Sequence, residues 1–287
     1  MLIDLQLHST YSDGYLTPRE LAKFADGKKI KIASLTDHNT VGGAEEFRRA
    51  CKEFKIKPIT GVELYAKLKS KRFNLLWYNF DDKNPELHAF LRNIQTRRRA
   101  QVRRILKKLV GLGLKIKINK VLDKYNHYVP LNRVVDDIWS VSANRAKIKR
   151  DLKNKRPREE EIVGAYFYNK KIGRLHETRV DIKRVLELRK KIGGQLVLNH
   201  PGRDNRLERN FLMTIKKLGI DGIEVLSPHH SIGAVMYAQF MAEEIGFIMS
   251  GGSDFHLEEG ENRPVQSSLE YFKIDSKHLK GIKKIIG

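Results

Sequence analysis

Histidine and acidic side chains recur along this sequence at the ends of short apolar segments. The members of this set are His8, Asp37, His38, Glu63, His200, Asp254 and His256. A single histidine in a loop is usually an ordinary surface or core residue, so the prediction depends on several of them meeting. Imidazole and carboxylate donors together suit Zn, Mn or Fe, and carboxylates shared between closely spaced ions suit phosphoryl transfer. The residue types therefore predict a site for divalent metal ions.

An alternation of strands and amphipathic helices would bring these side chains together. We expect strands at Leu2–Leu7, Lys31–Thr36, Pro58–Tyr65, Phe73–Phe80, Gln195–Asn199, Asp221–Leu226 and Phe247–Ser250. We expect helices at Pro18–Gly27, Ala44–Phe54, Asp181–Ile192, Leu207–Leu218, Ile232–Ile245 and Lys277–Ile286. Such a rhythm is typical of a mainly parallel sheet or barrel, in which the carboxyl ends of the strands converge on one face. The predicted fold class is an α/β barrel.

The alternation is interrupted in the middle of the chain. From about Pro85 the sequence becomes a long basic helical stretch with Arg97-Arg98-Arg99 and Arg103-Arg104, followed by less regular helical segments up to Arg174. We interpret residues 81–175 as an inserted helical subdomain, so that residues 1–80 and 176–287 form one discontinuous barrel.

Composition limits the classes of protein that remain. The 287 residues carry 56 Lys and Arg against 34 Asp and Glu, a net charge of +22, and about fifteen of these excess charges lie in residues 81–175. This excess indicates a phosphate-rich partner such as nucleic acid or a nucleotide, although a generally lysine-rich surface stays open as an alternative. The lone Cys51 excludes a disulfide framework. With no apolar run long enough for a membrane span, we expect a cytoplasmic, unexported protein.

Six segments give the sequence a specific resemblance. They are Asp4–Gly14, Leu35–Thr40, Gly61–Glu63, Asn199–Arg203, Ile223–His230 and Gly251–His256. In this order they resemble the polymerase and histidinol phosphatase (PHP) superfamily, over nearly the whole chain. The basic helical insertion is similar to that of the branch that hydrolyses nucleoside 3',5'-bisphosphates and trims RNA from its 5' end.

The resemblance implies a distorted (β/α)7 barrel that holds one to three divalent ions, with Mn favoured and Zn, Fe or Mg as alternatives. The ligands of the first ion would be Gln6, His8, Glu63 and Asp254. Those of the second ion would be Glu63, Asn74 and His200. Those of the third ion would be Asp13, His38 and His256. Gln6 and Asn74 stand where the family has histidine. Because carboxamide oxygens are poor zinc ligands but bind harder ions, we expect Gln6 and Asn74 to be weak or lost ligands and the first two sites to be weaker.

The resemblance also implies roles in catalysis and substrate binding. Glu63 would bridge metals, His230 would act as a general acid or phosphate donor, and Asp37 would be a ligand or would orient one. A structural loop histidine is an equally open interpretation of His230. Guanidinium groups suit the second phosphate of a bisphosphate, and the candidates are Arg97, Arg98, Arg99, Arg133 and Arg203. For the helical arginines the alternative is a solvated face.

The leading hypothesis is a metal-dependent phosphoesterase that hydrolyses nucleoside 3',5'-bisphosphates or the 5' end of short RNA with metal-activated water. A catalytically weakened scaffold that binds nucleic acid through its basic insertion is the second hypothesis. The third hypothesis is a phosphatase of the histidinol-phosphate type. It does not explain the function of the basic insertion.

Overall fold

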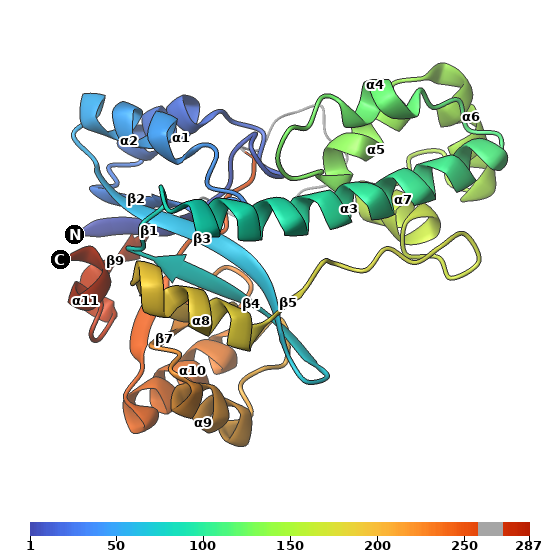
Figure 1. Ribbon diagram of the computed structural model, residues 1–287. Helices are drawn as coiled ribbons and strands as arrows, with labels where there is room; N and C mark the ends of the chain where they lie inside the picture. The colour runs from blue at the N-terminus through green and yellow to red at the C-terminus, as the bar shows by residue number, and fades with distance from the viewer. Residues whose placement is uncertain (258–271) are drawn as a thin grey trace. The chain divides into compact units, whose positions relative to one another are not determined.

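The computed structural model describes residues 1–257 and 272–287 (Figure 1). The described residues form two compact units: unit 1 comprises 1–91, 179–257 and 272–287, and unit 2 comprises 92–178. The long helix α3 (Pro85–Gly111) passes through the first boundary without a break, which is why this boundary lies later than the predicted residue 81.

Unit 1 is built on one curved sheet, whose strands follow the order β8-β7-β6-β4-β3-β2-β1-β9. The strands with at least four residues are β1 (Leu2–Leu7), β2 (Ile32–Leu35), β3 (Lys57–Leu68), β4 (Lys71–Tyr78), β6 (Gln195–Asn199), β7 (Gly222–Leu226) and β8 (Ile248–Gly251). Neighbours are parallel except that β4 is antiparallel to β3 and to β6, and β9 is antiparallel to β1. Two short strands, β5 (Val180–Asp181) and β9 (Ile274–Asp275), were not predicted.

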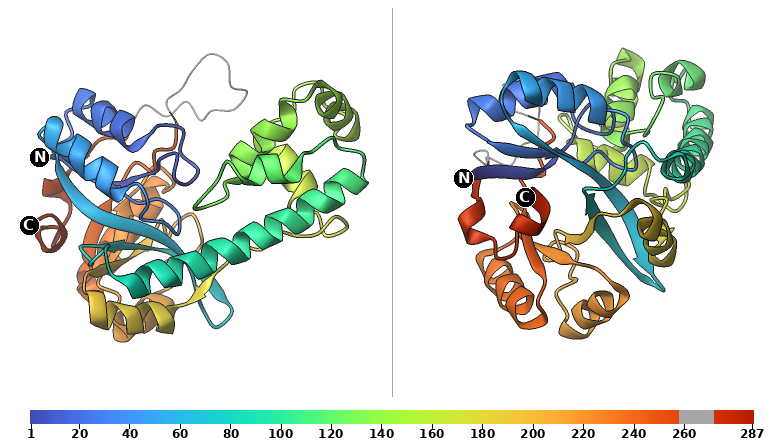
Figure 2. Two further views of the ribbon diagram at one scale, coloured as in Figure 1. Left: turned by 45° about the horizontal axis from the view of Figure 1, so that its top comes forward. Right: turned by 60° about the vertical axis from the view of Figure 1, so that its left-hand side comes forward.

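The two edges of the sheet approach each other, which makes it a nearly closed barrel (Figure 2, right). Leu7 at the end of β1 forms a parallel bridge with Phe255, beyond the end of β8. The N–H of His8 donates to the carbonyl of Phe255 over 3.0 Å. Gly252 makes this approach achievable, because a Cβ there would lie 2.4 Å from Cβ of Gln6.

Helices cover the outside of this barrel. They are α1 (Pro18–Gly27), α2 (Ala44–Glu53), α8 (Ile182–Ile192), α9 (Arg209–Leu218), α10 (Ile232–Ile245) and α11 (Lys283–Ile286). Helix α1 begins as predicted, with Thr17 and Glu20 forming a reciprocal capping box around Pro18. Its apolar face joins that of α2 against β1 and β2 in a core that includes Leu7, Leu35 and Phe47. These contacts fix the strand ends that carry the candidate site.

The predicted C-terminal helix Lys277–Ile286 is wrong in its extent. The chain forms a 3-10 turn at Ser276–His278, and α11 begins only at Lys283. Gly281 lies between them with a φ of +79°. Because this left-handed conformation is incompatible with a continuous right-handed helix, it separates the two turns.

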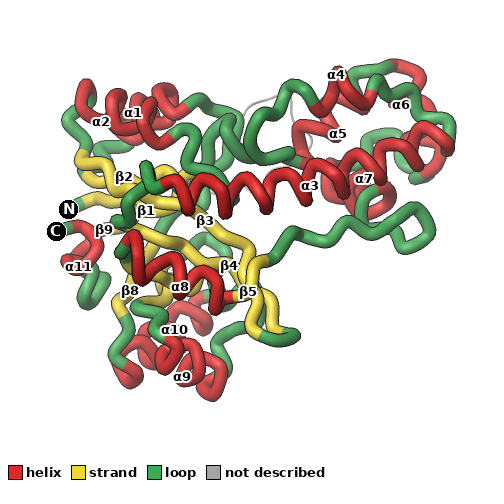
Figure 3. The backbone as a smooth tube through the Cα atoms, in the orientation of Figure 1, coloured by secondary structure: helices red, strands yellow, loops and turns green. Residues whose placement is uncertain are grey.

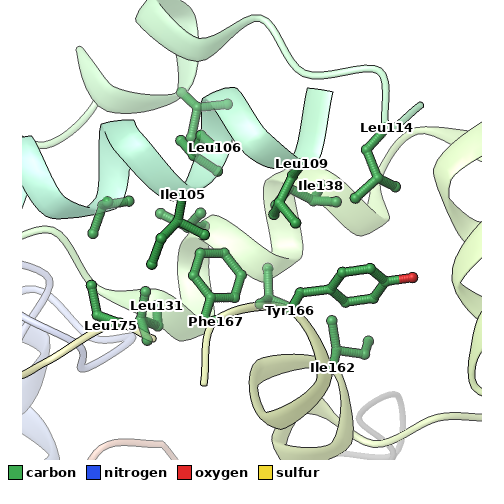
Figure 4. Close-up of a cluster of buried hydrophobic side chains, with 14 of the residues drawn as sticks. Ile105, Leu106, Leu109, Leu114, Leu131, Ile138, Ile162, Tyr166, Phe167 and Leu175 are labelled. Atoms are coloured by element: carbon green, nitrogen blue, oxygen red, sulfur yellow. The ribbon is translucent and has the colours of Figure 1, made fainter. Parts of the chain in front are cut away.

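The regular elements of unit 2 are helices joined by loops, drawn red and green in Figure 3. Besides the C-terminal part of α3 it contains α4 (Ile118–Leu122), α5 (Leu131–Trp139), α6 (Ser142–Asp151) and α7 (Glu159–Tyr166). One side of α3, with Ile105, Leu106 and Leu109, packs on Ile138 and Phe167 in a separate hydrophobic core (Figure 4). In the described part of the chain no helix is both long and apolar enough to cross a bilayer.

Candidate metal centre

The strand ends of unit 1 bring the ligand-type side chains into one buried region. His8 follows β1 directly, His38 follows β2, and Glu63 lies within β3. Asp254 and His256 follow β8, and the Leu7–Phe255 bridge holds that segment against β1. His38 and Glu63 are themselves joined by a parallel bridge. The convergence expected of a barrel therefore occurs in the structure.

Two buried aspartates, Asp4 and Asp37, hold the loops of this region in place. Asp4 accepts hydrogen bonds from the backbone of Ser253 at 3.0 Å and from its hydroxyl at 2.5 Å. Asp37 accepts from the backbone and hydroxyl of Ser9, at 2.7 and 2.6 Å, and from the Ser12 hydroxyl at 2.5 Å. The carboxylate of Asp37 is thus engaged by the loop that leads to Asp13, which favours an orienting role for Asp37 over a direct part in catalysis.

The first group of metal-ligand type residues surrounds Asp13. His8, Asp13, His38 and His256 each offer one donor atom, and these atoms all lie within 4.8 Å of one another. Nδ1 of His8 lies 3.6 Å from the Asp13 carboxylate, and the Nε2 atoms of His38 and His256 each lie 3.4 Å from it. The Nδ1 atom of His256 is hydrogen bonded to the carbonyl of Asp254 at 2.6 Å. This bond leaves Nε2 of His256 as the basic nitrogen that faces Asp13.

The second group consists of His8, Glu63 and Asp254. Nε2 of His8 lies 3.2 Å from Glu63 and 3.1 Å from Asp254, so the two nitrogens of this imidazole face different groups. The amide nitrogen of Gln6 lies between the two carboxylates, 3.3 Å from Glu63 and 2.8 Å from Asp254. Gln6 thus contacts the residues with which the resemblance places it, but through its N–H groups.

The other oxygen of Glu63 meets two more amides. Oε1 of Glu63 accepts from Nδ2 of Asn74 at 2.7 Å and from Nδ2 of Asn199 at 2.8 Å. On its far side, Oδ1 of Asn74 accepts from Arg179 at 3.4 Å. His200 lies further away, with Nε2 at 3.6 Å from Glu63. The side-chain oxygen of Asn74 faces Arg179 and not Glu63. This geometry agrees with the prediction that Asn74 is a weak or lost metal ligand.

Burial and charge act in opposite directions on these groups. Burial alone would lower the pKa of His8, but its contacts with Asp254 and Glu63 raise that pKa well above the ordinary value. Burial would raise the pKa of Glu63, yet the charge of His38 and the contacts with His200 and His8 hold it well below its usual range. The carboxylates therefore need compensating positive charge, which protonated imidazoles or a divalent cation can provide.

The two adjacent histidines after β7 differ in their surroundings. Nδ1 of His230 bonds the carbonyl of Val225 at 2.9 Å, and its Nε2 accepts the N–H of Gly202 at 3.1 Å. Both ring nitrogens are thus used by the backbone, which supports the structural interpretation of His230 over a general acid. His229 was not predicted, yet its Nε2 lies 2.6 Å from Asp254 and a third of its side chain is exposed. The sequence feature that could have identified His229 is its position next to His230.

The predicted substrate-binding arginines have different environments. In unit 1, Arg203 is 54% exposed and lies 3.9 Å from Asp254. In unit 2, Arg97 is exposed and Arg133 is half-buried. Arg98 is buried and donates to the carbonyl of Val129 at 2.7 Å, and Arg99 donates to two carbonyls and to Asp123. Substrate contact is therefore not supported for Arg98 and Arg99, which hold the loops of unit 2 together.

Comparison with known proteins places this geometry in a family. A family model described as PHP domain matches residues 4–172, more than half of the 287 residues. The chain belongs to the PHP domain family. The 5'-3' exoribonuclease of Haemophilus influenzae is 28% identical over 259 residues, which cover 88% of this PHP chain and 89% of the relative. The 3',5'-nucleoside bisphosphate phosphatase of Chromobacterium violaceum is 26% identical over 257 residues, which cover 88% of this chain and 87% of the relative.

Solved structures share the fold. A metal-dependent phosphoesterase structure from Bifidobacterium adolescentis superimposes with a TM-score of 0.79 at 21% identity, covering 99% of this chain and 95% of the other. A Chromobacterium violaceum amidohydrolase structure with bound sulfate gives 0.72 at 24% identity, covering 88% of this chain and 87% of the other. These structures confirm the predicted PHP-type barrel, and the named activities of the two relatives agree with the predicted phosphoesterase.

Proposed function

We propose that this protein hydrolyses phosphate esters of nucleotides, either nucleoside 3',5'-bisphosphates or the 5' end of short RNA, with Mn²⁺ as the favoured ion in a cytoplasmic setting. The observation that carries the proposal is the convergence of three imidazoles on the Asp13 carboxylate inside a PHP barrel. The two relatives named for these activities align with 88% of the chain, which supports the substrate class.

The residues present fit a divalent ion. Both ring nitrogens of His8 are buried and have no hydrogen-bond partner among the described residues, although carboxylates lie close to them. Such groups are the usual donors for Mn, Fe and Zn. When bound, the ion supplies Lewis-acid chemistry, which lowers the pKa of a water molecule and neutralises charge on phosphoryl oxygens.

The protein's own side chains then position the phosphate and move protons. Arg203 and His229 are the partly exposed basic groups beside Asp254, so they can donate hydrogen bonds to a phosphate that enters there. His229 is held at 2.6 Å by Asp254, an arrangement that orients an imidazole for donation to a leaving oxygen. The basic surface of unit 2, including Arg97, adds attraction for the remaining phosphates of RNA.

The test is phosphate release from adenosine 3',5'-bisphosphate and from 5'-end-labelled short RNA, with added MnCl₂ and with EDTA as the control. We expect release that requires the ion and is lost in Asp13→Asn. Histidinol phosphate serves as the competing substrate, and faster release from it would replace the nucleotide assignment.

A second candidate function is nucleic-acid binding without hydrolysis. The observation that favours it is the concentration of about fifteen excess positive charges in residues 81–175. Tight RNA binding that weakens steeply with salt, combined with no phosphate release under any metal, would establish it and end the enzyme proposal.

A further inference from the structure

The two metal-ligand groups share His8, and this sharing limits what each can bind. An imidazole that binds an ion through one nitrogen ordinarily donates its other N–H to a carboxylate or carbonyl. Nδ1 of His8 faces Asp13 at 3.6 Å, whereas Nε2 faces Glu63 and Asp254 at 3.2 and 3.1 Å. One group therefore receives the ligand nitrogen and the other receives the N–H.

Three side-chain amides already donate hydrogen bonds to Glu63. An ionised carboxylate offers about four lone pairs in all. Oε1 accepts from Asn74 and Asn199, at 2.7 and 2.8 Å, and Oε2 is within 3.3 Å of Gln6 and 3.2 Å of His8. Three amide N–H groups thus occupy three of the four acceptor positions and an imidazole nitrogen of His8 faces Oε2, which leaves little of the carboxylate open to a cation.

Arg179 fixes the orientation of one of these amides. The guanidinium of Arg179 donates to Oδ1 of Asn74 at 3.4 Å and to the carbonyl of Phe73 at 3.1 Å. Turning the Asn74 amide over would place its NH₂ against the guanidinium and its oxygen against the Glu63 carboxylate. Both contacts would be repulsive, so Asn74 keeps its N–H groups towards Glu63.

The carboxylate of Asp254 is likewise surrounded by side-chain nitrogen atoms. Its Oδ1 accepts from Gln6 at 2.8 Å and lies 3.1 Å from His8, and its Oδ2 lies 2.6 Å from His229. The second group is thus closed by N–H donors on several sides. The group around Asp13 differs, because three ring nitrogens point at one carboxylate from 3.4 to 3.6 Å and the amides of Gln6 and Asn74 hydrogen bond elsewhere.

We propose that this PHP centre binds one divalent ion, through Nδ1 of His8, Nε2 of His38, Nε2 of His256 and the Asp13 carboxylate. Glu63 and Asp254 orient His8 as hydrogen-bond acceptors, and the amides of Gln6, Asn74 and Asn199 take the place of further ions. Three nitrogens and one oxygen form a donor set for Zn²⁺, Mn²⁺ or Fe²⁺, and a poor one for Mg²⁺. The inference deepens the proposed function and rests on it for the use of the ion.

The first experiment counts ions in the full-length protein. Metal-stripped protein is titrated with MnCl₂ by equilibrium dialysis, bound Mn is measured by elemental analysis, and the spectrum is recorded by electron paramagnetic resonance. We expect saturation at one Mn²⁺ per chain with an uncoupled six-line spectrum, and no saturation with MgCl₂ at the same concentrations. Two or more ions per chain, or an exchange-coupled spectrum, would overturn the proposal.

Variants separate ligands from orienting residues. Asp13→Asn and His256→Ala are each expected to weaken Mn²⁺ binding at least about a hundredfold. Glu63→Gln is expected to weaken it about 10- to 100-fold while the count stays at one, as for other partners of ligating histidines. Asp204→Asn removes the same charge from a partly exposed aspartate outside both groups, and it should change neither quantity. Unchanged binding in both Asp13→Asn and His256→Ala would refute the ligand set.

The reverse change tests the role of the amides. Gln6→His combined with Asn74→His replaces two N–H donors by imidazoles, and we expect the count to rise above one. A count that stays at one would show that the amides are not what excludes further ions. Phosphate release is scored separately: one ion without release contradicts the proposed function only, and release with two ions contradicts this inference only.

Discussion

Replacement of Arg98 by alanine is expected to destabilise unit 2 by about 3 to 5 kcal/mol, whereas Arg97→Ala is expected to change its stability by less than about 0.5 kcal/mol. The two arginines are neighbours on α3 and carry the same charge. Arg98 is 3% exposed, and its guanidinium pairs with Glu177 and lies 4.1 Å from the ring centre of Tyr128. Arg97 is exposed to solvent.

The magnitude follows from the groups that Arg98→Ala would leave behind. The carbonyl of Val129 would lose the donor that lies 2.7 Å away, at a cost of about 1–3 kcal/mol. The carboxylate of Glu177, only 17% exposed, would lose its partner, and the contact with the Tyr128 ring is worth about 0.5–1 kcal/mol more. A domain of ordinary stability has about 5–15 kcal/mol, so unit 2 would become marginal.

The assay is urea unfolding followed by tryptophan fluorescence. The chain has two tryptophans, Trp77 in unit 1 and Trp139 in unit 2, where it packs on the hydrophobic core. In a Trp77→Phe background the signal of Trp139 reports unit 2, and Arg97→Ala and Arg98→Ala are compared there. Equal midpoints for the two variants would refute the structural role of Arg98 and return it to the substrate-binding candidates.

Three further predictions concern unit 1. Glu63→Gln should lower phosphate release about 10- to 100-fold, more than any single arginine substitution, as measured at saturating Mn²⁺. His229→Ala should lower kcat with an unchanged melting temperature, whereas His230→Ala should lower the melting temperature, because its ring bonds two backbone groups. The Gly252→Ala change should destabilise unit 1 by at least about 1–3 kcal/mol in thermal unfolding, while Gly27→Ala, with open space around it, should not.

Most of the barrel was predictable because its strands and helices carry local signals. The alternation of apolar segments located the strands, and the capping box at Thr17 located the start of α1. The antiparallel direction of β4 was not predictable in this way, because strand periodicity is the same in either direction. The two-residue strands β5 and β9 were missed since so short a segment has no periodicity of its own.

The sequence predicted which residues lie in the candidate site better than it predicted what each of them does there. Residue type and position after a strand identified His8, His38 and Asp254, which the barrel brings together. The role of Asp37 depended on the hydroxyls of Ser9 and Ser12, whose direction is set by a loop and not by any pattern in the sequence. The roles of the arginines likewise depended on which side of α3 faces the core of unit 2.

The amides around Glu63 show how a metal centre can change while its scaffold is retained. A buried carboxylate that loses a bound cation is left uncompensated, which is costly unless N–H donors replace the ion. One histidine-to-amide replacement would supply only part of those donors, whereas Gln6, Asn74 and Asn199 together donate three hydrogen bonds to Glu63, beside the imidazole of His8. The two departures from the family pattern are therefore better understood as one coordinated change than as two independent losses. The group around Asp13 keeps three imidazoles beside one carboxylate, and this is where the proposed single ion would bind.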